Sequence, residues 1–421
     1  MKTRTAFAFS TLSLITLAGS LAVGCSSAAG DEGIEDQESP DTISRNDDPR
    51  RLLPGASSRL EDIITAADVS KTFGTPDDKV PYPDTYWPFV EEGIDARWNG
   101  ESTVSPLEKY MTLADGRNLA AAQGWEHKFH GTQVPGVLSW FGHCPGWTAS
   151  AMLNAPLKHA AFAKADGQGS LVACTEGETG CTRFEIGDIN ALQAEVHVDA
   201  RSRFIGNRCD TKPSEVERDA NGRIVRTGAG CQGLNPGALM IVMGDQLKKH
   251  KSAMAINAQS NSNTDQIWNQ PAYGYHVYAY ENLTEAEAAN LVAHGTKTGE
   301  QTKYGWNDAA KGFARVDVGL KWVTEHGPNL TPFSGASSTR EMRMVAVIEL
   351  DAAPTSANAT IIGGEYLEDE TVGADRLTVP PFVWIAEGPG PERLSTRVGG
   401  NNHNPYVKPS LVAKLVQLAQ K

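Results

Sequence analysis

The chain has 421 residues, a formal net charge of −13 and 40% hydrophobic residues. This length allows one large domain or two ordinary domains, each with a substantial core. The acidic balance argues against the basic surface that nucleic-acid binding needs, so no nucleic-acid partner is expected.

The first 24 residues have the pattern of a secretory signal peptide. Lys2 and Arg4 precede a short apolar run, and small residues lead up to Cys25. A cysteine directly after Gly24 is typical of a bacterial lipoprotein signal, in which cleavage is accompanied by lipidation of that cysteine. We therefore expect residues 1–24 to be removed and Cys25 to carry the lipid. The expected location is the bacterial cell envelope, as an outer-membrane lipoprotein or an extracellular protein.

Residues 25–55 are polar, acidic and poor in large apolar side chains. Such a segment buries too little apolar surface to offset the entropy of ordering, so it is predicted to be a disordered tether. The folded domain is predicted to span residues 56–421.

Helical patterns come first in this domain. A proline early in the segment indicates a helix start at residues 105–110, and an alanine-rich stretch predicts a helix over 119–125. His127 and His130 follow at a spacing of three, which suits metal ligands in principle. Because no carboxylate partner is recognised in register with them, no metal site is predicted.

Cys144 stands between a turn rich in glycine and aromatic residues and a segment with helical character. Pro145 suits the first turn of that helix, where its missing N–H costs nothing. A thiol at a helix N-terminus faces unpaired backbone N–H groups and the positive end of the helix dipole, and both favour the nucleophilic thiolate. Cys144 is therefore a candidate catalytic nucleophile.

The remaining cysteines support this interpretation. With Cys25 lipidated, five cysteines remain, which is an odd number in an oxidising compartment. Two local disulfides, Cys174 with Cys181 and Cys209 with Cys231, would leave Cys144 as the free thiol. No Cys-x-x-Cys spacing predicts a zinc site.

Strand patterns dominate the second half of the chain. A further helix is predicted over 184–200, one opens at the capping box of Thr284 and Glu287, and one ends the chain at 410–418. Strands are predicted at 238–243, 252–257, 273–280, 314–318, 342–350, 360–362 and 382–385. Helices followed by mostly antiparallel strands indicate the α+β class.

Five segments, in this order, resemble the transglutaminase elicitor family known from plant-pathogenic oomycetes. They are residues 105–110, the Trp-Phe-Gly-His-Cys-Pro-Gly-Trp motif of 140–147, Asn-Pro-Gly-Ala at 235–238, the Trp-Asn-Gln-Pro segment within 267–278, and 361–366. The resemblance covers roughly residues 95–420. It implies a papain-like core with the nucleophile helix packed on a mainly antiparallel sheet. It also implies an acyltransferase that joins a glutamine carboxamide of one protein to a lysine amine of another.

This chemistry needs an imidazole base and a group that orients it. By comparison with papain-like cores, Asn257 stands where the orienting residue is expected. The family pattern implies a histidine base shortly after Asn-Pro-Gly, and Met240 occupies that position here. His250 and His276 are the candidate bases, with His143 as a further choice. Trp140 and Trp147 are expected to shape the acyl-donor site. Calcium dependence has been associated with the family, although no loop here has calcium-ligand spacing, and no other cofactor is expected.

Two further functions stay open. A papain-like amidase or protease would use the same thiolate with water as the acceptor. A non-catalytic surface lipoprotein is favoured by Met240, because methionine cannot accept a proton.

Overall fold

The computed structural model describes residues 43, 48–207, 233–258, 266–293, 300–333, 338–367, 379–389 and 402–421. Its largest element is a twisted sheet with the strand order β10-β9-β8-β7-β6-β11-β5, in which β1 also pairs with β7. The described pairings in this sheet are all antiparallel. The strands are β1 (Thr72–Gly74), β5 (Arg201–Gly206), β6 (Met254–Asn257), β7 (Asn269–Leu283), β8 (Gly312–Val323), β9 (Thr339–Leu350), β10 (Ile361–Tyr366) and β11 (Phe382–Gly388).

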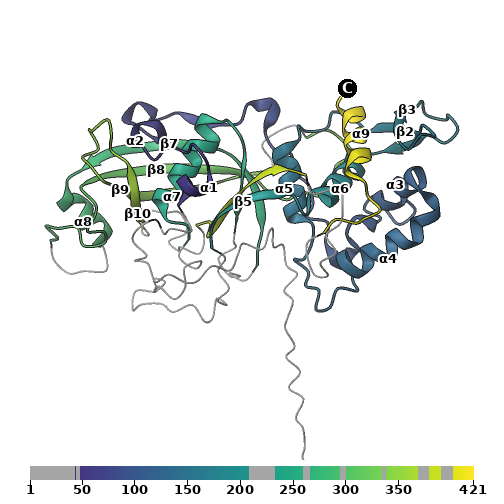
Figure 1. Ribbon diagram of the computed structural model, residues 1–421, viewed down its shortest axis with the longest axis horizontal. Helices are drawn as coiled ribbons and strands as arrows, with labels where there is room; N and C mark the ends of the chain where they lie inside the picture. The colour runs from purple at the N-terminus through teal and green to yellow at the C-terminus, as the bar shows by residue number, and fades with distance from the viewer. Residues whose placement is uncertain are drawn as a thin grey trace, which may run out of the picture.

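A helical lobe lies at one end of this elongated molecule, on the right in Figure 1. A small sheet of order β3-β2-β4 completes the lobe. The elements of the lobe are α3 (Pro106–Ala114), α4 (Leu119–His130), α5 (Cys144–Leu153), β2 (Ala161–Ala165), β3 (Leu171–Ala173), β4 (Thr182–Phe184), α6 (Ile186–His197) and α9 (Pro409–Gln420).

Shorter elements connect and cover these two parts. They are α1 (Pro49–Leu52), α2 (Leu60–Ile63), η1 (Ala66–Asp68), η2 (Asp77–Lys79), η3 (Phe89–Glu91), η4 (Gly93–Asp95), η5 (Gly116–Asn118), α7 (Pro236–Met243), η8 (Gly244–Lys249) and α8 (Glu285–Ala293). None of the helices in the described ranges has the length and apolarity needed to span a membrane.

The two faces of the sheet belong to different apolar clusters. In β6, Met254 and Ile256 pack into the cluster that contains α7, whereas Ala255 between them packs with Cys144 of α5. Successive side chains of a strand point to opposite faces. Helices α5 and α7 therefore cover opposite faces of the sheet.

The segment 238–243 was predicted to be a strand, and this is wrong: it belongs to the helix α7. The side chain of Asn235 caps this helix by accepting hydrogen bonds from the N–H groups of Gly237 and Ala238, and Pro236 occupies the first turn. Because every residue of α7 is buried, the run has no polar face that would reveal its helical period.

The other predicted elements are confirmed, with shifted ends. The capping box at Thr284 is present, with its Oγ1 accepting from the N–H of Glu287 and its own N–H donating to the Glu287 carboxylate. The α+β class is confirmed by this mixture of helices with antiparallel sheet.

The packed part of the chain begins earlier than residue 56. Helix α1 lies at Pro49–Leu52, and Leu53 is buried in the main apolar cluster. The final part of the predicted tether is therefore folded. The predicted signal peptide, Cys25 and most of the predicted tether lie outside the described residues.

Candidate functional site

Cys144 is the first residue of α5, and the structure places it as the sequence predicts, at a helix N-terminus with Pro145 in the first turn. Its side chain is 1% exposed and packs against Ala255, Phe382 and Trp384 of the sheet. Helix α5 thus presents the sulfur to one face of the antiparallel sheet.

Cys144 is disulfide-bonded, to a partner outside the described residues, so the prediction of a free thiol here is wrong. The predicted disulfide between Cys174 and Cys181 is confirmed, with a Cα–Cα distance of 5.8 Å. Cys209 and Cys231 lie outside the described residues, as does Cys25. The error arose because spacing along the chain reports only local pairs, whereas the fold decides which distant cysteines meet.

Two polar atoms lie beside the Cys144 sulfur. The Asn269 Nδ2 atom is 3.6 Å from Sγ, and the carbonyl oxygen of Ile267 is 3.8 Å from it. Asn269 is held on both sides, because its Oδ1 accepts from Trp384 Nε1 at 2.8 Å and its backbone carbonyl accepts from Thr148 Oγ1 at 2.8 Å. A buried carboxamide is thereby fixed with its N–H₂ group toward the sulfur.

Sequence reasoning gave Asn269 no chemical role. The residue belongs to the Trp-Asn-Gln-Pro segment that carried the family resemblance, and this was the available signal. The predicted orienting residue, Asn257, pairs directly with Asn269 across β6 and β7. Its Oδ1 accepts from the backbone N–H of Trp268 at 2.8 Å, so it supports the loop beside the sulfur rather than orienting a histidine.

Neither candidate base is brought to Cys144. His250 follows η8 and is half exposed, with its Nε2 3.5 Å from the Asp245 carboxylate. His276 lies on β7, with its Nδ1 2.9 Å from Thr72 Oγ1. Among the histidines that the structure describes, none is hydrogen-bonded to the Cys144 sulfur.

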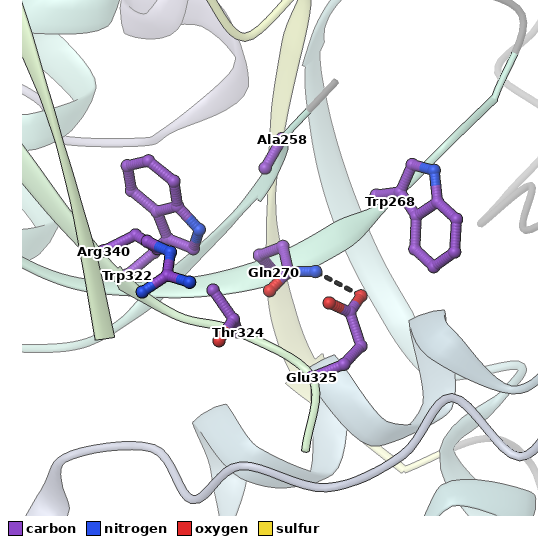
Figure 2. Close-up of a pocket in the computed structure, with 7 residues that line it drawn as sticks. All are labelled: Ala258, Trp268, Gln270, Trp322, Thr324, Glu325 and Arg340. Atoms are coloured by element: carbon purple, nitrogen blue, oxygen red, sulfur yellow. Dashed lines mark hydrogen bonds between the residues drawn. The ribbon is translucent and has the colours of Figure 1, made fainter. Parts of the chain in front are cut away.

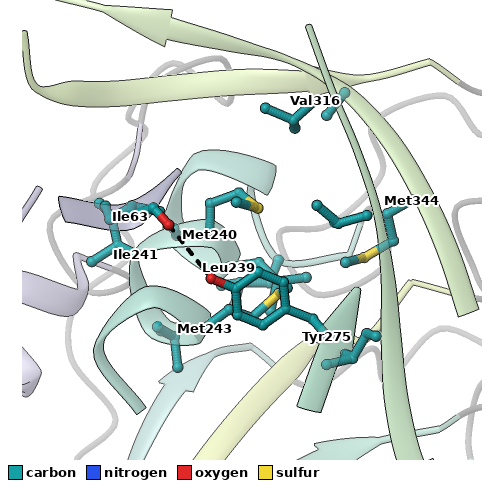
Figure 3. Packing of buried hydrophobic residues seen from close by; sticks show 14 of the residues in the cluster. Ile63, Leu239, Met240, Ile241, Met243, Tyr275, Val316 and Met344 are labelled. Carbon is teal, nitrogen blue, oxygen red and sulfur yellow. Dashed lines mark hydrogen bonds between the residues drawn. The ribbon is translucent and has the colours of Figure 1, made fainter. Parts of the chain in front are cut away.

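Met240 does not occupy the base position either. It lies on α7, in the apolar cluster on the other face of the sheet from Cys144, near Val316 and Met344 (Figure 3). The assignment of Met240 to the base position is therefore wrong. It rested on the family's spacing after Asn-Pro-Gly, but within the helix at 236–243 this side chain packs into the core.

The remaining predicted site residues, Trp147, Trp140 and His143, are buried and engaged in other contacts. Trp147 is fully buried, and its Nε1 donates to the carbonyl of Tyr82 at 3.1 Å, so it is a core residue and not the wall of a substrate site. Trp140 is 8% exposed and packs edge-on against Phe141. The His143 ring points toward the carboxylates of Glu126 and Glu195, so it is not placed as the base for Cys144.

His143 belongs to a buried group of four ionisable side chains that also contains Glu126, His130 and Glu195. Glu126 precedes His130 by four residues on α4, so the carboxylate that sequence analysis did not recognise is in register. Burial alone would lower the pKa of His130, but the charges of Glu195 and Glu126 outweigh it and raise that pKa to about 10. Burial would raise the pKa of Glu126, but hydrogen bonds and charges from His130 and His143 lower it.

An open pocket of about 420 Å³ lies beside Trp268, the residue that follows Ile267. Figure 2 shows the rings of Trp268 and Trp322 on either side of Gln270 and Glu325, with Gln270 Nε2 donating to the Glu325 carboxylate. Burial raises the pKa of Glu325. The pocket offers aromatic walls, the Glu325 carboxyl, the Gln270 carboxamide and the Arg340 guanidinium to a side chain entering from solvent.

Comparisons with known proteins agree with this architecture. The family model described as transglutaminase elicitor matches residues 125–405, about two thirds of the chain, including Cys144 and Asn269. A solved structure of the GP42 transglutaminase from Phytophthora sojae is similar in fold, with a TM-score of 0.60 and 20% identity. The match covers 88% of this chain and 95% of that one. No match was found among curated proteins. The matched segment contains four of the five motif segments, the helix that begins at Cys144 and the strands that face it, and the chain belongs to the transglutaminase elicitor family.

Proposed function

We propose that this protein is a transglutaminase-like acyltransferase whose Cys144 is blocked by a disulfide and is released by reduction. The observation that carries the proposal is the Asn269 carboxamide, held 3.6 Å from the Cys144 sulfur at the N-terminus of α5. A carboxamide N–H₂ group and the free N–H groups of a helix start are the donors that stabilise an oxyanion at an attacking thiolate.

The reaction would begin when a dithiol reductant exchanges with the disulfide. The reductant becomes oxidised, and Cys144 and its partner each become thiols. The Cys144 sulfur then attacks the carbonyl carbon of a glutamine side chain, the C–N bond breaks, and ammonia leaves with the thiol proton. A lysine amine attacks the thioester, forms the isopeptide bond and returns the thiol. Because no described histidine is hydrogen-bonded to Sγ, the helix N-terminus is the feature that favours the thiolate.

The pocket beside Trp268 supports an amine as the second substrate. The Trp268 and Trp322 rings would cover the apolar stem of a lysine side chain, and Glu325 would accept a hydrogen bond from its amine. The positive charge of Arg340 in the same pocket favours the uncharged, nucleophilic form of that amine. A raised pKa at Glu325 also suits a group that takes the proton from the incoming amine.

The test measures two products from one reaction. The purified chain is incubated with a glutamine peptide and a fluorescent primary amine, with and without a phosphine reductant, and ammonia and incorporated amine are quantified. We expect both products only after reduction and neither in C144A. The double variant C174S/C181S is the control, because it lacks the other described disulfide and should still require reduction.

The other outcomes overturn the proposal in distinguishable ways. Ammonia without amine incorporation would identify an amidase or protease. Reduced protein whose Cys144 is alkylated by iodoacetamide, but which gives neither product, would identify a non-catalytic member of the family. Transfer without reduction would contradict the blocked state.

We also propose that the mature protein is a lipoprotein of the bacterial envelope, anchored through Cys25. The signal-like pattern of residues 1–24 supports this. Growth of an expressing bacterium with a labelled fatty acid should label the wild-type chain and leave C25S unlabelled. Equal labelling of both chains, or labelling of neither, would exclude the anchor.

A further inference from the structure

The four buried side chains behind the N-terminus of α5 come from three separate elements. Glu126 and His130 lie on α4, His143 immediately precedes α5, and Glu195 lies on α6. Their exposed fractions are between 0% and 4%. One nitrogen or oxygen from each residue lies within 4.8 Å of those of the other three.

The distances within this group suit ligands of one metal ion. His130 Nδ1 and His143 Nε2 are each 3.3 Å from Glu195 Oε2, and His143 Nε2 is 3.4 Å from Glu126 Oε1. Zinc binds nitrogen and oxygen at about 2.0–2.2 Å in a tetrahedron, so two of its ligands lie roughly 3.3–3.5 Å apart. A hydrogen bond between an imidazolium and a carboxylate would be shorter, at about 2.7–2.9 Å.

Three atoms of the group are buried without a hydrogen-bond partner in the described structure: His130 Nδ1, His143 Nδ1 and Glu195 Oε2. Two of these, His130 Nδ1 and Glu195 Oε2, are ligand atoms that face each other at 3.3 Å. A buried polar atom left without a partner costs about 1–3 kcal/mol, and more when it is charged. An ion between these atoms would satisfy both at once.

The charges of the group also suit a divalent cation. A metal ion displaces the proton of a ligating histidine. Two carboxylates with two neutral imidazoles then carry a charge of −2, which one divalent ion cancels. Buried charges are stable only when they are paired or coordinate a metal.

Hydrogen bonds around the group fix the carboxylates. Asn404 Nδ2 donates to Glu126 Oε2 at 3.0 Å, and the Asn404 backbone N–H donates to Glu195 Oε1. The backbone N–H of Ile94 donates to Glu126 Oε1 at 3.2 Å. Such outer contacts orient ligands in metal sites and leave the inner oxygen of Glu195 directed at the two histidines.

The histidine rings are held by packing. Phe89 stacks on His130 at a centroid distance of 5.1 Å and meets His143 edge-on at 5.2 Å. Gly93 closes the group from another side, because a Cβ atom there would lie 2.6 Å from Glu126 Oε1 and 3.1 Å from His143 Nε2. The fold thus leaves no room for a side chain where the ligands meet.

We propose that Glu126, His130, His143 and Glu195 bind one zinc ion that joins α4, α6 and the start of α5. Two imidazoles with two carboxylates suit zinc, whereas calcium takes six to eight oxygen ligands. Four protein ligands leave no open position, so the role of the ion is structural. The zinc ion would fix His143, the residue before Cys144, whether or not the protein transfers acyl groups.

The test uses the oxidised full chain, so that thiols do not bind the metal. The protein is stripped with a chelator, incubated with zinc, dialysed and analysed for bound metal, and its melting temperature is recorded at each stage. Cobalt replaces zinc in a parallel sample, because tetrahedral cobalt has strong visible absorption. We expect one zinc per chain, a melting temperature restored by zinc, and tetrahedral cobalt bands.

Variants identify the ligands. E195Q keeps the size of the side chain and should bind zinc at least about tenfold more weakly, without the tetrahedral cobalt spectrum. H127Q is the matched control, because His127 lies on the same helix and pairs with Asp95 instead. It should bind like the wild type.

Three results would overturn the proposal. They are a wild-type chain that retains no zinc, zinc retained equally in E195Q and the wild type, or equal loss of zinc in E195Q and H127Q. If E195Q does not fold, H130Q is measured in the same way and read by the same criteria.

Discussion

Trp384 donates a 2.8 Å hydrogen bond from Nε1 to Oδ1 of Asn269, and this bond aims the Asn269 N–H₂ group at the Cys144 sulfur. The two residues come from β11 and β7, which are separated in the sheet by β6. The indole therefore sets the rotamer of the carboxamide from across the sheet.

The first prediction concerns a variant that lacks this bond. W384F keeps an aromatic ring in the core but removes the bond that fixes the Asn269 Oδ1 atom. We expect amine incorporation after reduction to fall about tenfold or more, since loss of one oxyanion donor typically costs 10²–10³. W98F is the control, because it loses the same kind of bond, to Asp188, and packs against an apolar cluster that does not contain Cys144. Equal activity in W384F and W98F would show that Asn269 orientation does not matter.

The second prediction concerns the contact between α5 and α6. A Cβ atom on Gly146 would lie 1.9 Å from the backbone oxygen of Ala194, so the two helices would have to separate. We expect G146A to lower the free energy of unfolding by about 3 kcal/mol. G124A is the control, since a Cβ on Gly124 of α4 meets nothing within 4 Å, and it should raise the stability by about 0.5–1 kcal/mol. Denaturant unfolding measures both, and a G146A chain as stable as the wild type would refute the close approach.

The third prediction is a pH dependence. Asp84 is fully buried, and burial raises its pKa to about 8 from 3.8. The folded protein thus holds a proton that the unfolded chain releases near pH 4, so stability falls as pH rises toward 8, by at most about 1.4 kcal/mol per unit. In D84N this part of the slope should disappear. Urea unfolding between pH 5 and 8 measures how the free energy of unfolding changes with pH, and D77N, at an exposed position, is the control. The same pH dependence in D84N and the wild type would contradict a raised pKa at Asp84.

The fourth prediction tests the place of Met240. M240H puts an imidazole where sequence comparison expected the catalytic base, but on the opposite face of the sheet from Cys144. We expect no gain in amine incorporation and a loss of stability of about 2 kcal/mol, because the ring would be buried among apolar side chains. M240L, which conserves volume, should stay within about 1.5 kcal/mol of the wild type. A rise in activity in M240H would restore Met240 to the active site.

Local signals in the sequence predicted the elements that depend on local chemistry. The capping box at Thr284, the proline after Cys144 and the apolar runs of strand length in the second half are of this kind. The helix over 236–243 was missed because a fully buried run is apolar on every side, and a strand and a helix then share the same pattern.

The candidate site was predicted only in part, for a related reason. The position of Cys144 at a helix start follows from neighbouring residues. The Asn269 contact with Cys144 and the contact of His130 with Glu195 join residues more than fifty positions apart, which no spacing rule reports. Glu126 is different, since it stands one helical turn before His130 and could have been noticed.

Asn404 touches both carboxylates of the buried group, although 209 positions separate it from Glu195, the last of the four members in the chain. A ribosome must therefore add more than two hundred residues after Glu195 before this group acquires these hydrogen bonds. The lobe around α4 and α6 is completed only then, and a product truncated before Asn404 leaves two buried acids short of donors.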